Sequence, residues 1–291
     1  MLSRVVLFFI VLCILVMIYY AREHTFGFLS RNEAAEVFKN ANICQYMPTA
    51  ELRIRVGAIG ATRKELVANA ERIYEQSTED FTASEIALLS KCTTSAFLNI
   101  RHNFKISPKV INFIKTADMY PMHMCYTIVL DNSTGYIVIS RGALAGITKT
   151  LINHEIYHIY QKLNQRDCNA MYQSMGLIRI ATSNIMCDEI LLFNPDDEIG
   201  FKWVVRYFSG YLLPTLMTTG GKIQQKILLL KNAPAPVMYM AASWLYDECP
   251  YKLIVYKPWL DTYGISIEDM DGLGNDRHSP NEITAHINTE M

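Results

Sequence analysis

Residues 154 to 158 read His154-Glu155-Ile156-Tyr157-His158, an H-E-x-x-H sequence inside an apolar stretch. Within residues 151–160 the only charged side chain is Glu155. Residues 146–164 have the length of a helix, no internal proline and apolar side chains at a spacing close to 3.6, so we expect a helix here, capped by Thr148 or Thr150. A helix this apolar belongs in the interior of a domain, because buried charges need partners.

The two histidines of this motif lie one helical turn apart. Side chains at positions i and i+4 share a helix face, so the two imidazoles can bind one metal ion, with Glu155 held beside it. This is the arrangement of zinc hydrolases. In the alternative interpretation, His154 and His158 belong to an ordinary amphipathic helix and Glu155 is solvated. That leaves unexplained why the only carboxylate of the apolar run lies between the histidines.

The composition is that of a folded domain. The chain has 291 residues, of which 51% are hydrophobic and 19% charged, so it can bury a large core and is too apolar to be disordered. Its formal net charge is -1, and it has no basic run, so we expect no nucleic-acid partner. No internal repeat divides the chain.

The N-terminus carries a long apolar run. Residues 5–21 are 17 uncharged and mostly bulky residues, which at 1.5 Å rise per residue just cross a bilayer core. A cleavable signal peptide would end in small residues, whereas Tyr19 and Tyr20 stand here. A buried core helix is a third reading. We therefore predict a transmembrane signal-anchor over residues 1–24 and a single-pass membrane protein.

The remainder, residues 25–291, is expected to be one domain. Residues 25–105 are predicted to form a helical layer, with capping boxes starting at Thr62 and Thr82. Residues 106–291 would hold the metal site. In this region, residues 125–130 and 136–140 predict a β-hairpin, and the chain beyond residue 165 is expected to be mostly helical.

The expected fold class is therefore α+β. It is a mainly helical, zincin-like metallopeptidase domain with a small β-sheet or hairpin before the H-E-x-x-H helix, and with the N-terminal transmembrane helix. An edge strand of the hairpin could pair with an extended substrate while the helix supplies the metal ligands. A hairpin that serves only as scaffold fits the sequence equally well.

A catalytic zinc needs a third protein ligand and leaves one position for water. The metzincin pattern is excluded, because Gln161 and Asn164 stand where it has glycine and histidine. A later glutamate is the natural alternative, with Glu282 and then Glu189 as the main candidates. Glu282 follows a helix-start signal at Ser279-Pro280 and has small residues on the next turn. Other glutamates that compete for this role are Glu198 and Glu248.

Several segments together resemble a known family of proteins. They are residues 110–116, residues 126–130, residues 151–153 with the metal motif, residues 160–161, residues 175–177, residues 194–196 and residues 280–282. Their order is similar to that of zinc metallopeptidases encoded by large DNA viruses of algae and protists. The chain departs from this family in having Leu191-Leu192-Phe193 where a basic residue is expected. The segment at Glu282 also resembles the third-ligand helix of gluzincins, but has His286 where that helix often carries an aspartate. The resemblance implies a gluzincin-like fold, the ligands His154, His158 and Glu282, and Glu155 as general base.

The functional hypothesis is a membrane-anchored, zinc-dependent metallopeptidase that acts on a peptide or protein substrate. Zn²⁺ would activate a water molecule, and Glu155 would take its proton. Candidates for a donor to the oxyanion are Tyr207, Tyr263 and His278. The alternatives are an inactive structural or interaction protein of a membrane or virion that keeps a zinc site, and a zinc hydrolase of a non-peptide amide.

Overall fold

The computed structural model describes most of the chain after the N-terminal run. The described residues are 25–58, 60–93, 104–118, 125–187, 190–219, 222–233, 237–245, 251–272 and 278–289. The predicted anchor over residues 1–24 lies outside them. Within the described ranges, no helix combines the length and the apolar character needed to span a membrane.

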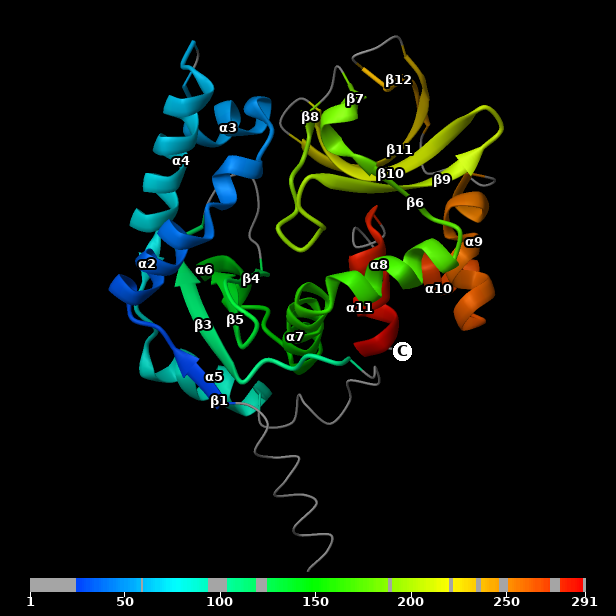
Figure 1. Cartoon of the computed structure of the whole chain (residues 1–291). Helices are drawn as coiled ribbons and strands as arrows, with labels where there is room; N and C mark the ends of the chain where they lie inside the picture. Colours follow the sequence, from blue (N-terminus) through cyan, green and yellow to red (C-terminus); the bar gives the residue numbers. More distant parts are fainter. Residues whose placement is uncertain are drawn as a thin grey trace, which may run out of the picture.

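A five-stranded sheet forms the first half of the fold (Figure 1). Its strands are β1 (Thr25–Phe28), β2 (Thr78–Glu79), β3 (Val110–Thr116), β4 (Cys125–Val129) and β5 (Thr134–Ser140). The order is β1-β3-β5-β4, and β2 pairs with one end of β3. β1, β3 and β5 are parallel, whereas β4 is antiparallel to β5 and lies at the edge. The predicted hairpin is confirmed as β4 and β5.

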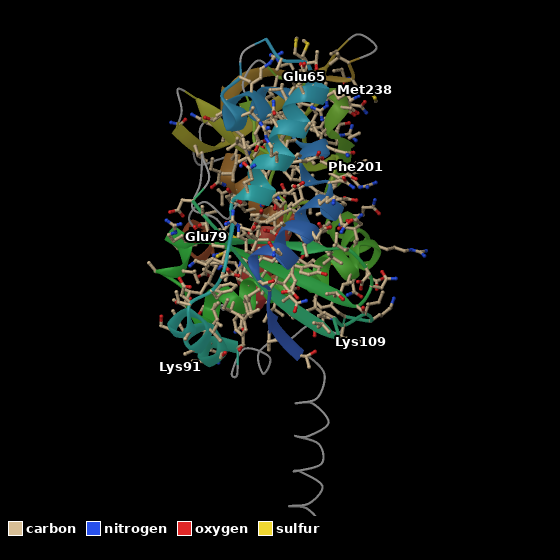
Figure 2. The ribbon with its side chains drawn as sticks, turned by 90° about the vertical axis from the view of Figure 1, so that its left-hand side faces the viewer. Glu65, Glu79, Lys91, Lys109, Phe201 and Met238 are labelled. Atoms are coloured by element: carbon tan, nitrogen blue, oxygen red, sulfur yellow. The ribbon has the colours of Figure 1, made fainter. Side chains whose placement is uncertain are left out.

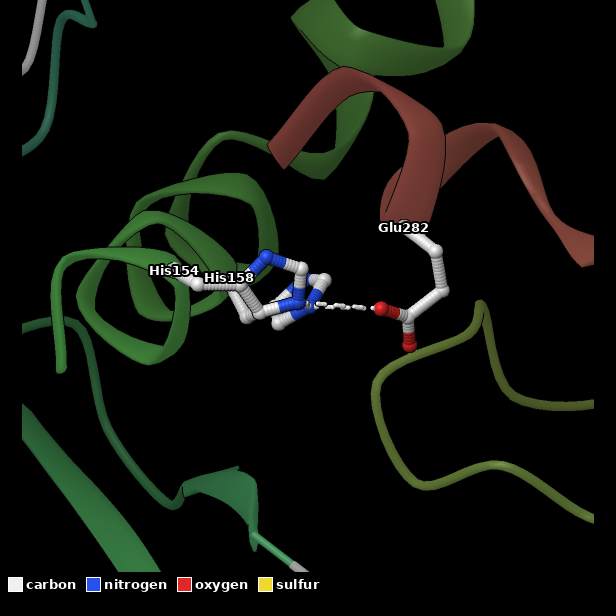
Figure 3. Close-up of side chains that lie close together, drawn as sticks. All are labelled: His154, His158 and Glu282. Carbon is white, nitrogen blue, oxygen red and sulfur yellow. Dashed lines mark hydrogen bonds and ion pairs between the residues drawn. The ribbon is translucent and has the colours of Figure 1, made fainter. Parts of the chain in front are cut away.

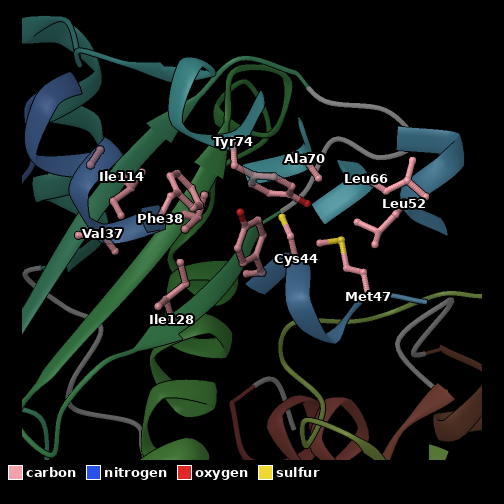
Figure 4. Close-up of a cluster of buried hydrophobic side chains, with 13 residues drawn as sticks. Val37, Phe38, Cys44, Met47, Leu52, Leu66, Ala70, Tyr74, Ile114 and Ile128 are labelled. Atoms are coloured by element: carbon pink, nitrogen blue, oxygen red, sulfur yellow. The ribbon is translucent and has the colours of Figure 1, made fainter. Parts of the chain in front are cut away.

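Helices cover one face of this sheet. They are α2 (Arg31–Ala41), the 3-10 turn η1 (Ile43–Tyr46) and α4 (Arg63–Gln76), and α3 (Thr49–Val56) packs against α4. Figure 4 shows the core between them and the sheet, in which Phe38, Leu66 and Tyr74 meet Ile114 and Ile128. Viewed from their own side, these helices extend from the first sheet to the level of the second (Figure 2).

Both predicted capping boxes are present. The Thr62 hydroxyl accepts a hydrogen bond from the Glu65 amide, and the Glu65 carboxylate accepts one from the Thr62 amide. Thr82 and Glu85 make the same exchange before α5 (Ala83–Thr93). Each box satisfies backbone N–H groups that have no partner inside the helix.

The metal-motif helix packs on the opposite face of the sheet. After the short α6 (Arg141–Leu144), α7 spans Lys149–Leu163, and the Thr148 hydroxyl caps it by accepting from the Leu151 amide at 3.1 Å. The isoleucines of α7 join those of β3 and β5 in one buried cluster. The helix predicted over residues 146–164 is confirmed, together with its Thr148 cap.

The prediction for the second half of the chain is wrong. After α8 (Gln165–Ser174), a seven-stranded sheet occupies most of residues 178–245. Its strands are β6 (Ile178–Ala181), β7 (Ile185–Met186), β8 (Ile190–Leu191), β9 (Phe201–Tyr207), β10 (Gly210–Thr219), β11 (Lys222–Asn232) and β12 (Tyr239–Leu245), with a 3-10 turn η3 (Thr182–Asn184). The path is β6-β9-β10-β11-β12-β7, and β8 pairs with β10. The fold is therefore not a mainly helical, zincin-like domain with one small sheet.

The physical reason lies in the apolar runs of this region. Residues 222–232 read KIQQKILLLKN, which has neither strict alternation nor a clear helical period. A short apolar run of this kind cannot be assigned to helix or strand by periodicity alone. Here the pairing partner makes the run a strand. β10 and β11 pair antiparallel over nine residues each, from Tyr211 to Thr219 against Lys222 to Leu230.

Three C-terminal helices complete the fold. They are α9 (Tyr251–Tyr263), α10 (Ile267–Gly272) and α11 (Pro280–Thr289). Buried aromatic residues, among them Tyr172, Trp203, Tyr256 and Trp259, join α8, α9 and α11 to the second sheet. This core fixes α11 beside α7 (Figure 1).

The contact between the first sheet and α7 is close at one glycine. A Cβ atom added at Gly135 would lie 2.5 Å from Ile159 Cγ2 of α7. We predict that Gly135→Ala lowers the free energy of unfolding by about 1–3 kcal/mol, because both elements lie in a packed core. Gly146→Ala is the matched control, since its nearest neighbour would be 3.9 Å away. Chemical denaturation measures both. Equal stability of the two variants would contradict the close packing.

Candidate metal centre

α7 places the two motif histidines on one buried face. His154 and His158 are 6% and 1% exposed, and their Nε2 atoms are 2.9 Å apart. The rings meet edge to face, with centroids 4.6 Å apart. Since the residues are four positions apart on a regular helix, the local sequence alone brings these nitrogens together.

α11 brings a carboxylate to the same point. Glu282 Oε2 lies 3.0 Å from His154 Nε2 and 3.2 Å from His158 Nε2 (Figure 3). Ser279 precedes the helix and its hydroxyl accepts from the Glu282 amide at 3.3 Å, which sets Glu282 in the first turn. Thr284 and Ala285 are fully buried, and small side chains let two helices approach closely.

These three ligand atoms are able to hold one metal ion. With bonds of about 2.0–2.1 Å, ligand atoms of a tetrahedral zinc site lie about 3.3 Å from one another. The two histidine Nε2 atoms and Glu282 Oε2 are 2.9, 3.0 and 3.2 Å from one another, slightly less than this value. Three ligand atoms this close can bind the same ion. Two imidazoles and one carboxylate are also a ligand set of catalytic zinc sites, which keep a fourth position open.

A hydrogen-bonded chain fixes the ring of His158. Its Nδ1 lies 2.7 Å from the side-chain oxygen of Gln161, and the Gln161 amide donates to Asn281 O at 3.0 Å and to the Tyr172 hydroxyl at 3.2 Å. With Gln161 accepting from Nδ1–H, the Nε2 lone pair of His158 faces the centre. Partners of this kind orient metal ligands and set their basicity. His154 Nδ1, by contrast, is buried with no hydrogen-bond partner among the described residues.

A loop after β8 orients the carboxylate. The Asn194 side-chain amide donates to Glu282 Oε1, which leaves Oε2 for the histidines. The same amide nitrogen lies 3.2 Å from His278 Nε2. Two residues on, the carbonyl oxygen of Asp196 accepts from the Asn281 side chain at 2.8 Å, so the loop is also tied to α11.

Glu155 is a buried carboxylate that the described hydrogen bonds do not explain. It is 3% exposed, and its Oε2 has no hydrogen-bond partner among the described residues. Burial raises the pKa of Glu155 well above its usual range, and the carboxylates of Asp196 and Glu282 raise it further. A cation held by the neighbouring ligands would lower this pKa, because it adds positive charge beside the carboxylate.

His158 and Glu282 shift each other's pKa in the direction of a charged pair. Burial lowers the pKa of His158, but the carboxylates of Glu282 and Asp196 outweigh it and raise the pKa to about 10. Burial likewise raises the pKa of Glu282, but the imidazoles of His158 and His154 outweigh it and hold the pKa well below its usual range. The protein groups alone therefore attract a positive charge between these atoms, and a metal ion would replace the proton there.

The other candidate ligands do not join this group. Glu198 pairs with Arg179 and accepts from Asn169 at 3.1 Å. Glu189 and Glu248 lie outside the described residues. Glu282 is therefore the candidate that the structure brings to the two histidines.

The three candidates for an oxyanion donor lie in different places in the structure. Tyr207 and Tyr263 pack in the aromatic core around α9. His278 is connected to the centre through Asn194, whose side-chain amide contacts both His278 and Glu282. His286 lies next to the centre, with its ring centroid 5.3 Å from that of His154.

Sequence reasoning missed the residues that orient the ligands. From the sequence, Gln161 is a departure from the metzincin pattern and part of the family resemblance, with no role at the site, although its position three residues after His158 on the same helix is a usable signal. Asn194 enters the sequence analysis within residues 194–196 of the family resemblance, with no role at the metal site. No local pattern relates it to Glu282, which is 88 residues away.

Comparison of the chain with protein-family models, with curated proteins and with solved structures gave no match. Support for a metal centre therefore comes from the contacts within this chain.

The role of Gln161 can be tested by metal binding. We predict that Gln161→Met lowers zinc affinity about 10–100-fold, because His158 loses the partner that fixes its tautomer and ring orientation. Gln165→Met is the matched control, since Gln165 contacts Asn169 at 2.9 Å and no ligand. Competition with a chromophoric chelator measures both affinities. An unchanged affinity of Gln161→Met would contradict this role.

Proposed function

We propose that this protein is a zinc-dependent peptidase. The observation that carries the proposal is Glu155, a buried carboxylate without a hydrogen-bond partner for Oε2 among the described residues, next in sequence to the ligand His154. A metal that served only to stabilise the fold would need no such group. A hydrolase needs a base at this position.

The chemistry divides between the metal and the chain. When bound, zinc would polarise the scissile carbonyl and lower the pKa of water toward 7. Glu155 would accept the proton of the attacking water and deliver it to the nitrogen of the leaving amine. His154, His158 and Glu282 would hold the metal, with Gln161 and Asn194 keeping two of these side chains in position.

Two features favour a peptide over a smaller amide. β4 is an edge strand of the first sheet, and on either side of Thr127, whose outward groups bind Asp196 and Lys162, such an edge can pair with an extended main chain. In addition, α7 packs against β4, so the base and the strand belong to adjoining elements. Peptide hydrolysis by this centre is also the activity implied by the resemblance in the sequence.

The base assignment gives a direct prediction. Glu155→Gln should keep stoichiometric zinc, because Glu155 is not a ligand, and should lose peptide hydrolysis by at least about 100-fold. Zinc content and turnover of a mixed peptide pool are measured on the same preparation. Glu268→Gln, on the surface of α10, is the control for the same chemical change. Normal turnover by Glu155→Gln would refute the role of Glu155 as base.

A further inference from the structure

A cavity of about 390 Å³ lies beside β4. Its apolar walls come from Ile43, Ile128, Val129, Phe193, Pro195 and Ile199. Ile199 is 46% exposed, which is high for a large apolar side chain. The volume falls within the range of roughly 300–1,000 Å³ that is usual for ligand pockets.

The cavity lies on the same face of α7 as Glu155, at a distance that the helix sets. Lys162 is on its lining and follows Glu155 by seven residues on α7, which is nearly two helical turns and so the same face. At 1.5 Å per residue, the two positions are about 10 Å apart along the helix. An extended peptide covers this distance in about three residues.

The charged side chains on the lining are already paired. Lys162 contacts Asp196 at 2.9 Å, and Asp197 contacts Lys202 at 2.9 Å. Glu198, the remaining charged lining residue, pairs with Arg179. The cavity therefore offers apolar surface and no net charge, which favours an apolar occupant over a charged one.

The outward edge of β4 reaches the cavity at Val129. At Thr127 the N–H donates to Asp196 at 2.9 Å and the carbonyl oxygen accepts from Lys162, so both groups point away from β5. In an antiparallel pair this direction repeats every second residue. Val129, on the cavity lining, therefore presents its N–H and C=O on the same edge, where an extended main chain can pair with them.

We propose that this cavity is a subsite that binds one apolar side chain of an extended peptide, about three residues from the bond that is hydrolysed. The inference rests on the proposed peptidase function and adds a substrate preference to it. The lining supplies the apolar contact, Val129 supplies main-chain pairing, and α7 sets the distance to Glu155.

The test uses the zinc-loaded full chain and a pool of random decapeptides, with cleavage sites identified by mass spectrometry. Wild type should favour Leu, Ile or Phe three residues from the cleaved bond, on the N-terminal side if the peptide runs antiparallel to β4 and on the C-terminal side if parallel. Ile199→Glu should reduce this preference about ten-fold, because it places a charge at the apolar rim. Ile178→Glu is the matched control, since Ile178 is 36% exposed on β6 and does not line the cavity.

The outcomes separate the two proposals. Cleavage without an apolar preference at this distance, and with no effect of Ile199→Glu, would overturn the subsite and leave the peptidase function standing. No cleavage of any peptide by zinc-loaded wild type would overturn the peptidase function, and the subsite would fall with it.

Discussion

Two imidazoles and a carboxylate meet in the protein interior, where α7 packs against α11. Each of His154, His158 and Glu282 is less than 10% exposed, so water cannot solvate their charges and neighbouring groups or a bound cation must balance them. Glu282 joins segments more than 120 residues apart in the chain. The three side chains therefore meet only if α7 and α11 stay packed in this position. The surrounding structure holds the two helices there.

Each of the two sheets supports one of the two helices that form the site. The first sheet supports α7 through the isoleucine core and the close approach at Gly135. The second sheet supports α11 through the aromatic core that contains Trp203 and Trp259. The loop at Asn194 to Asp196 connects them, because it contacts Glu282 and Asn281 of α11 and, through Asp196, Thr127 of β4.

The parts of the fold that could be predicted from the sequence are those determined locally. The spacing of His154 and His158, the Thr148 cap and the β4–β5 hairpin are short-range patterns, and the structure has them. The second sheet could not be predicted, because runs such as residues 222–232 become strands only when a distant partner pairs with them. Glu282 was one of several candidates until the fold placed it. The resemblance to viral metallopeptidases stays a prediction.

The most direct test of the metal centre is a crystal structure of the zinc-loaded protein, with anomalous data collected at the zinc edge. We expect one zinc ion bound by His154 Nε2, His158 Nε2 and a Glu282 carboxylate oxygen at about 2.0–2.2 Å, with a fourth position not filled by protein. No zinc between the histidines, a fourth protein ligand, or a carboxylate other than Glu282 would contradict it.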